Sequence, residues 1–493
     1  MWEKLRAWLV PLIYLSDNWI SLIGVVLVTS CGVFWLFLLP VMLSGGPGNP
    51  YLGILTFMLL PGAFVLSLLL IPLGIILKRR AEGKSPVDLL TGRLTLDLRR
   101  IEVRRLAGFI AGTTIINIAI ASQLSYGAVN YMESVQFCGA TCHTVMKPEF
   151  TAYQNSSHSR VECVKCHIGP GASWFVRSKL SGIRQVFAVT FRTYSQPIPT
   201  PVRNLRPARD TCEQCHWPDR FGGDRLRVVS KFGDDEKNTQ SKTVLLMHIG
   251  GGSAKGIHGV HVGPGITIRY ASDEARQNIP WVSYQSGSNA PVNYSAEGFK
   301  QEKLATMTTR VMDCMDCHNR PSHTFQVPDR AVDEAMAAGR ISAALPFAKK
   351  QAIQTLKAGY QTSADAATKI PDAFESFYKQ SYPDIYRQRT TEVRHAAQAV
   401  LAIYNRNVFP EMKVTWGTYP NNLGHTDFTG CFRCHDDGHT ATGGLKITQD
   451  CNACHSLLAT EEQSPKILND LGLPAAEVKP AETEVTRKIP QQK

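Results

Sequence analysis

Three apolar stretches dominate the first 126 residues of this 493-residue chain. They run near residues 19 to 42, 51 to 77 and 106 to 126, and each could cross about 30 Å of hydrocarbon as an α-helix rising about 1.5 Å per residue. The third stretch, LAGFIAGTTIINIAIASQLSY, carries Asn117 and Gln123. The pattern predicts a membrane anchor at residues 1 to 130 with three crossing helices.

The charges between these stretches predict the orientation of the anchor. Residues 78 to 105 hold nine Lys or Arg and four acidic residues, whereas residues 44 to 51, SGGPGNPY, hold no positive charge. Loops rich in Lys and Arg stay in the cytoplasm. Three crossings would therefore place the N-terminus in the cytoplasm and the rest of the chain in the periplasm. Cys31 resembles a lipoprotein processing site, but the apolar run continues through Val41, which favours a packing residue.

A basic segment follows at residues 168 to 209, with seven Lys or Arg and no acidic residue. Its apolar residues recur near helical spacing, which predicts an amphipathic helix lying at the membrane interface. The net charge of +12 is concentrated here and in the loop before the third apolar stretch. This distribution favours anionic lipid headgroups as partners and not nucleic acid.

The remaining pattern divides the chain further. Residues 226 to 330 are Gly-rich and β-like, with the runs VLLMHIGGG and ITIRY, and residues 331 to 410 have a helical pattern. Residues 461 to 493 are polar and contain proline, which predicts a disordered tail. The predicted fold is thus a set of transmembrane helices followed by a domain of helices and loops with a small β-like region.

Twelve of the 13 cysteines form six pairs, and each pair is followed directly by a histidine. Three pairs fall in residues 131 to 225, one in 226 to 330 and two in 411 to 460. The first pair is separated by three residues and the other five by two. The cysteines are Cys138 and Cys142, Cys163 and Cys166, Cys212 and Cys215, Cys314 and Cys317, Cys431 and Cys434, and Cys451 and Cys454. The histidines are His143, His167, His216, His318, His435 and His455.

This spacing matches the chemistry of covalent haem attachment. Two thiols a short turn apart add to the vinyl groups of a haem, and the adjacent histidine becomes the proximal ligand of the iron. A zinc site or a redox dithiol also uses two close cysteines, but neither explains six copies with a trailing histidine. The motifs therefore predict six haem c groups. Free thiols in such number would not persist in an oxidising compartment, whereas thioethers do, so a periplasmic location is consistent.

Eight further histidines are available as distal ligands, which nearly matches six haems with two histidines each. His158, His323, His425 and His439 are predicted distal ligands, and two of His248, His258 and His261 should join them because glycine-rich backbone can approach a porphyrin. Met146, three residues after His143, competes for the first iron. His395 lies in a helical pattern away from any motif and is predicted to be structural or exposed.

The chain resembles the NapC/NirT/NrfH cytochromes, through the apolar helix leading to YMESVQFCGATCHTVMKPEF and the strings HSRVECVKCH and CEQCHWP. It is most similar to larger members from metal-respiring bacteria, through CMDCHNRPSH and GCFRCHDDGH. Smaller members have one crossing helix and four haems, so roles at the additional haems do not transfer. The resemblance implies an inner-membrane protein that oxidises menaquinol from the quinone pool and passes electrons to periplasmic c-type cytochromes or reductases in anaerobic respiration, with extracellular metal reduction as one destination.

The resemblance also implies a lysine and a carboxylate at the quinol site. Lys179 and Glu149 are the candidates, with Glu133 and Asp210 as substitutes, although a solvated surface role fits Lys179 equally well. A second hypothesis is a terminal reductase of a small oxyanion, which requires one haem with an open coordination position. The supply of histidines argues against it.

Overall fold

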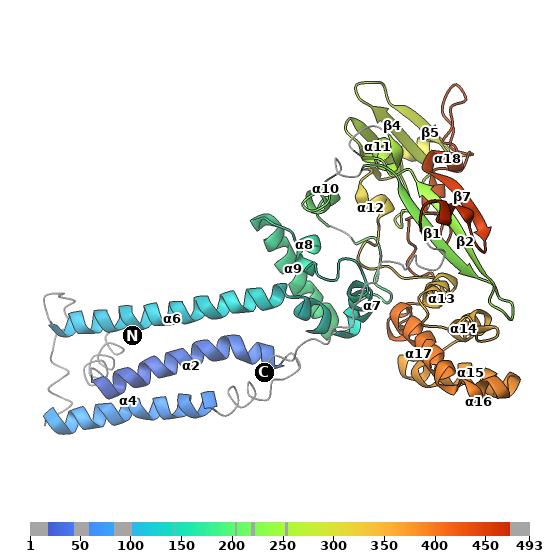
Figure 1. Ribbon diagram of the computed structural model, residues 1–493. Coiled ribbons are helices and arrows are strands. Elements are labelled where there is room, and N and C mark those ends of the chain that lie inside the picture. Colours follow the sequence, from blue (N-terminus) through green and yellow to red (C-terminus); the bar gives the residue numbers. More distant parts are fainter. Residues whose placement is uncertain are drawn as a thin grey trace. The chain divides into compact units, whose positions relative to one another are not determined.

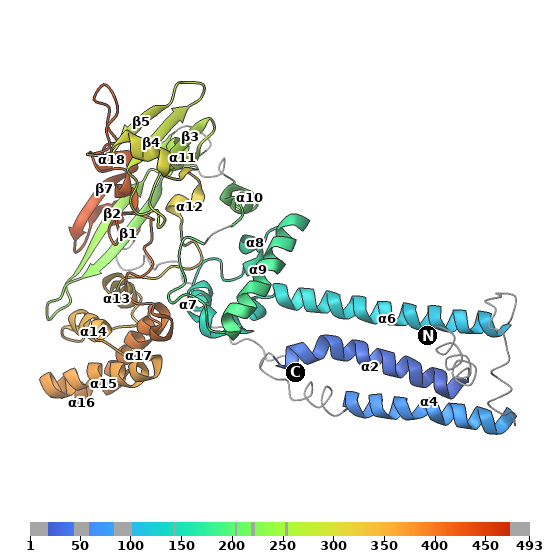
Figure 2. The ribbon, with the colours of Figure 1, turned by 180° about the vertical axis from the view of Figure 1, so that it is seen from behind.

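The computed structural model describes residues 18–43, 59–82, 101–141, 143–202, 205–217, 222–251 and 255–473. The chain divides into two compact units, Met1–Thr141 and Cys142–Lys493. Figures 1 and 2 show the helices and strands of each unit from opposite sides.

The first unit consists of three long helices, α2 (Trp19–Leu43), α4 (Leu60–Glu82) and α6 (Ile101–Glu133), followed by the π-helical turn η2 (Phe137–Thr141). Small residues bring α2 and α4 together: a Cβ atom on Gly24 would lie only 2.9 Å from the Ser67 carbonyl oxygen. The buried Ser21 hydroxyl donates a 2.8 Å hydrogen bond to the Ile71 carbonyl. Such contacts hold helices together where lipid supplies no hydrophobic driving force.

Two of the three predicted crossings coincide with candidate membrane-spanning helices. In the part of the chain that the structure describes, Trp19–Leu38 and Leu60–Lys78 are long and apolar enough to span a membrane. The third predicted crossing lies within α6, whose apolar pattern Asn117 and Gln123 interrupt. Asn117 donates a 3.2 Å hydrogen bond to Thr29 of α2, so α6 packs beside the first helix. The loop predicted to be cytoplasmic lies largely outside the described residues.

Two antiparallel sheets supply the framework of the second unit. The first has the order β1-β2-β7, from Arg225–Phe232, Gln240–Met247 and His455–Glu462. The second has the order β5-β4-β3-β6, from Val292–Ser295, Trp281–Ser286, Ile266–Ala271 and Thr309–Val311. The strands lie in the region whose sequence pattern is β-like, with the exception of β7.

Strand β7 and helix α19 (Lys466–Asp470) correct the prediction of a disordered tail from residue 461. Leu468 is fully buried in a small cluster with Val244 and Ala459. These contacts join segments more than 200 positions apart, which the local polar composition did not reveal. Residues 474 to 493 lie outside the described part.

Further helices lie before, between and after the strands, and several of them carry the cysteine motifs. They are α7 (His143–Gln154), α8 (Cys163–His167), α9 (Ala172–Thr190), α10 (Ala208–Cys212), α11 (Gly256–Val262), α12 (Cys314–Cys317), η4 (Gln301–Thr306), η5 (Pro410–Met412), η6 (Gly430–Arg433) and α18 (Cys451–Cys454).

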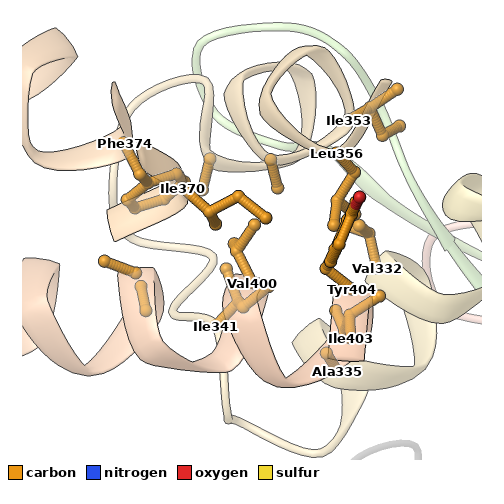
Figure 3. Close-up of a cluster of buried hydrophobic side chains, with 14 of the residues drawn as sticks. Val332, Ala335, Ile341, Ile353, Leu356, Ile370, Phe374, Val400, Ile403 and Tyr404 are labelled. Carbon is orange, nitrogen blue, oxygen red and sulfur yellow. The ribbon is translucent and has the colours of Figure 1, made fainter. Parts of the chain in front are cut away.

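The helical insert forms a packed subdomain of five helices. They are α13 (Pro328–Ala337), α14 (Ala348–Lys357), α15 (Ser363–Ser381), α16 (Pro383–Gln388) and α17 (Thr390–Asn407). Figure 3 shows side chains from these helices meeting in one core, where Ile370, Phe374 and Val400 are fully buried. Asp333 and Lys349 form a 2.9 Å ion pair and both hydrogen-bond the backbone of Phe232, which fixes the insert to the end of β1.

Candidate haem-binding site

The cysteines of the second to sixth motifs lie on short helical turns. A turn of this kind places residues three positions apart on one side, as two attachment thiols require. The backbone N–H groups of His216 and His318 donate to the carbonyl oxygens of Cys212 and Cys314, each at 2.8 Å, which closes the turn and directs the histidine back beneath it. The local fold therefore matches the expected attachment geometry.

Each of these five motif histidines faces a second histidine from a distant segment. The pairs, with the distance between ring centroids, are His216 with His158 at 6.0 Å, His167 with His323 at 6.1 Å, His318 with His258 at 6.3 Å, His435 with His261 at 5.8 Å, and His455 with His425 at 6.2 Å.

These separations are those expected for two imidazoles sharing one metal. A metal about 2 Å from each of two facing nitrogens, with each nitrogen about 1.1 Å from its ring centre, separates the centres by about 6.2 Å. Direct stacking would give shorter distances and would leave no room for an atom between the rings. The pairs therefore fit a haem iron with two axial histidines.

Burial keeps several of these imidazoles in the neutral form that binds metal. It lowers the pKa of His167, His261, His318 and His323, and the facing or neighbouring histidine lowers it further in the first three. Glu149 opposes the effect on His323. Neutral rings at neutral pH can donate a lone pair to iron.

A large continuous cavity runs among the motifs. Its volume is about 2770 Å³, and its walls include Cys166, His216, His318, His435 and His455. Single small-molecule sites occupy about 300–1,000 Å³. The cavity can therefore accommodate several large planar groups side by side.

Successive motifs lie next to one another from the second to the sixth. Burial, Cys163 and then Cys215 of the third motif raise the pKa of the Cys166 thiol. The Cys314 thiol of the fourth motif lies close enough to raise the pKa of the Cys212 thiol, so the third motif adjoins the fourth.

The later motifs continue the series. Arg433 of the fifth motif donates a 2.6 Å hydrogen bond to the carbonyl of Asp316 in the fourth. Phe432, also in the fifth motif, stacks on His425 at 4.3 Å, and His425 faces His455 of the sixth. The order of the five motifs in space therefore follows their order in the sequence.

The first motif lies where the two units meet along the chain. Cys138 is in the π-helical turn η2, Cys142 lies outside the described residues, and His143 begins α7. Met146 follows one turn later on α7 and is partly buried.

Three histidines have other surroundings. His439 is 2% exposed, and its ring nitrogens lie 2.7 Å from the Ile279 carbonyl and 2.9 Å from Asp436. Both nitrogens are thus engaged, which argues against the predicted distal role. His248 similarly contacts Asp224 at 3.2 Å and Ser456 at 3.1 Å. His395 is exposed on α17.

The two residues predicted for a quinol site have separate neighbours. The Lys179 ammonium lies 4.7 Å from the Phe175 ring centre on α9. Glu149 lies on α7, and its carboxylate pairs with Arg320 at 2.9 Å and with His323 at 3.3 Å. Because Glu149 is already ion-paired, the structure argues against its role as a free proton acceptor.

Arginines line the same cavity. Burial lowers the pKa of Arg227 and of Arg406, and the neighbouring Arg330 lowers that of Arg227 further. Arg330 also binds Asp427 and Thr426, beside the loop that holds His425. Clustered, partly desolvated guanidinium groups favour an anion between them. Sequence reasoning did not single out these residues, because strand β1 and helices α13 and α17 bring them together from distant positions in the chain.

Comparison with known proteins gives the family. Residues 101–199 match the N-terminal region of the NapC/NirT cytochrome c family. The chain is 39% identical over 454 residues to the cytochrome c-type protein ImcH of Geobacter sulfurreducens (strain ATCC 51573 / DSM 12127 / PCA). The aligned residues make up 91% of this chain and 89% of that protein. The chain belongs to the NapC/NirT cytochrome c family. No solved structure matches it.

Membership of the NapC/NirT family confirms the resemblance found in the sequence. A NapC/NirT cytochrome contains covalently bound haem c and carries electrons at a membrane. The paired histidines and the cavity fit that cofactor. The two apolar helices of the first unit fit membrane anchoring.

Proposed function

We propose that the chain binds six haem c groups, oxidises menaquinol at the periplasmic side of the inner membrane, and relays the electrons to periplasmic c-type cytochromes or reductases. The observation that carries this proposal is the set of five histidine pairs with ring centres 5.8 to 6.3 Å apart. Haem c with two axial histidines supplies a low-spin iron that accepts and releases one electron without binding substrate.

The residues of this chain would hold the groups as follows. Each pair of motif cysteines would form the two thioethers, and each facing histidine pair would ligate the iron. His158, His258, His261, His323 and His425 are thus the distal ligands of five motifs, and Met146 is the remaining candidate at the first. Arg227, Arg330 and Arg406 are suited to the propionates, because they place cations around the cavity.

The order of the motifs supports a relay. The second to sixth motifs adjoin one another in sequence order, so the carriers that they hold would form one series. A relay needs haems that lie close to one another and irons that have no open coordination position. The histidine pairs would fill both axial positions of each iron. An oxyanion reductase instead needs an open iron, and five of the six motif histidines already face a second ligand.

Helix α9 supports contact with the membrane. Val176, Leu180, Ile183 and Phe187 form one exposed stripe at helical spacing, each more than half exposed. The basic residues of the same segment suit anionic headgroups. We propose that this stripe enters the lipid interface and that the quinol reaches the protein there.

The orientation follows from the proposed third crossing. If α6 spans the bilayer with α2 and α4, the basic loop before it is cytoplasmic and the second unit is periplasmic.

Reduction of the purified, detergent-solubilised protein by a menaquinol analogue tests the proposal. Rapid reduction, followed at the haem absorption bands, is the expected result, with a mass increase that corresponds to six haems. Haems that stay oxidised in the presence of the quinol would overturn the proposed reaction. A mass corresponding to fewer haems would overturn only the count.

A further inference from the structure

A buried ion pair lies directly behind one of the distal histidine candidates. Both carboxylate oxygens of Glu149 accept hydrogen bonds of 2.9 Å from the same guanidinium nitrogen, Nη2, of Arg320. The Arg320 side chain is 6% exposed and that of Glu149 14%. A carboxylate and a guanidinium so far removed from water bind strongly, and each is held by the other.

The same network holds His323. Its Nδ1 lies 3.0 Å from the backbone oxygen of Glu149 and 3.3 Å from a carboxylate oxygen of the same residue. Arg320 Nε donates a 2.6 Å hydrogen bond to the His323 carbonyl. Because Nδ1 faces these acceptors, Nε2 is the nitrogen left to face His167, whose ring centre is 6.1 Å away.

Aromatic side chains fix the guanidinium in place. Its carbon lies 4.2 Å from the centre of the Tyr419 ring and 5.1 Å from that of Phe325. The Tyr419 hydroxyl donates a 3.0 Å hydrogen bond to the Ile198 carbonyl. Arg320 therefore has little freedom to move, and the Glu149 carboxylate is held at a defined distance from the imidazole.

Carboxylates placed behind a metal-bound histidine have a known physical effect. A hydrogen bond from Nδ1–H fixes the tautomer and the ring orientation, and it makes Nε2 more basic. A more basic ligand, together with a nearby negative charge, stabilises ferric over ferrous iron. The redox potential of such a centre is therefore lower than it would be with a neutral partner.

We propose that Glu149 is a positioning residue for the second haem, where it orients His323 and lowers the redox potential, and not the proton acceptor of a quinol site. The inference rests on the proposed function, because it requires that His167 and His323 share one iron. Arg320 limits the effect by balancing part of the carboxylate charge. The loop after the fourth motif thereby helps to set the potential of the second centre.

The variant Glu149→Gln tests this role, because glutamine keeps the size of the side chain and removes its charge. The matched control is Glu162→Gln, which removes a carboxylate next to Cys163 of the same motif, but from a side chain that is 58% exposed. Both proteins are purified with all haems attached and titrated spectroelectrochemically. In Glu149→Gln the redox transition of one haem should move to a more positive potential, and the low-spin EPR signal of that haem should change. In Glu162→Gln neither should change appreciably.

Two further variants separate the possible failures. His323→Ala identifies the component, because it should convert one low-spin haem to a high-spin form; if no low-spin signal is lost, the proposed ligation is wrong. If that signal is lost but Glu149→Gln shifts no redox transition beyond the control, the positioning role is wrong and the ligation stands.

Glu149→Asp replaces the glutamine variant as the test if the glutamine variant does not assemble. It should move the same component in the same direction by less, and no shift beyond the control would overturn the inference.

Discussion

The imidazole of His425 lies against the ring of Phe432, with 4.3 Å between ring centres and 17° between planes. His425 faces His455 of the sixth motif at 6.2 Å, whereas Phe432 stands between the two cysteines of the fifth motif. A side chain of one motif therefore holds the partner histidine of the next. The fifth and sixth centres therefore share a structural contact, and we expect a change at one centre to alter the other.

Replacement of His425 by alanine should open the sixth centre. We expect one low-spin EPR signal to be lost, and one ferrous haem to bind carbon monoxide, because no second imidazole would face His455. The measurement is EPR of the oxidised protein together with carbon monoxide difference spectra. The control is His395→Ala, at an exposed position on α17, which should leave both unchanged. An unaltered spectrum in His425→Ala would rule out this pairing.

Replacement of His439 by alanine should lower stability without altering the haems. The ring is buried, and its hydrogen bonds to the Ile279 carbonyl and Asp436 would be lost. Loss of a buried hydrogen-bonding group costs about 1–3 kcal/mol. Thermal unfolding should show the loss, with the full set of low-spin signals retained. Disappearance of a low-spin signal would instead make His439 a ligand.

Replacement of Phe374 by alanine should loosen the helical insert alone. The side chain is fully buried among residues of the insert core, and phenylalanine-to-alanine changes in cores cost about 3–5 kcal/mol. Hydrogen exchange of the α15 and α17 amides should accelerate, while the haem spectra stay the same. Leu445→Ala, at a position 55% exposed, should alter exchange little. A changed haem spectrum in Phe374→Ala would contradict the prediction that the core of the insert is independent of the haem sites.

A spin label on the apolar stripe of α9 should report lipid. Cysteines introduced at Leu180 and, as a control, at Gln185 of the same helix can be labelled in the haem-loaded protein and reconstituted in anionic vesicles. The label at 180 should collide more with oxygen, and the label at 185 more with a water-soluble relaxation agent. Equal exposure of both labels to the water-soluble agent would exclude membrane contact by this helix.

The sequence predicted the local parts of this molecule well. Haem attachment depends on a few consecutive residues, so the six motifs can be recognised without a fold. The helices of the insert and the amphipathic helix α9 follow from periodicity over one segment. The apolar patterns of α2 and α4 likewise depend only on nearby residues.

Features that depend on distant contacts could not be predicted in the same way. His425 and His439 both flank the fifth motif, each between a glycine and a threonine. They differ only in the folded chain, where His439 hydrogen-bonds the Ile279 carbonyl and Asp436 whereas His425 faces His455. His258 and His261 could be chosen over His248 only once α11 was seen to place them, three positions apart, toward different motifs. Strand β7 was missed because its partner β2 lies far away in the sequence.

The most direct test of the account counts the axial ligands. Near-infrared magnetic circular dichroism of the fully oxidised protein distinguishes bis-histidine haems from those with methionine or with an open position. The account predicts a bis-histidine intensity that corresponds to five haems, with the first haem giving a separate signal. A bis-histidine intensity of four or fewer would contradict the assignment of the five histidine pairs as ligands.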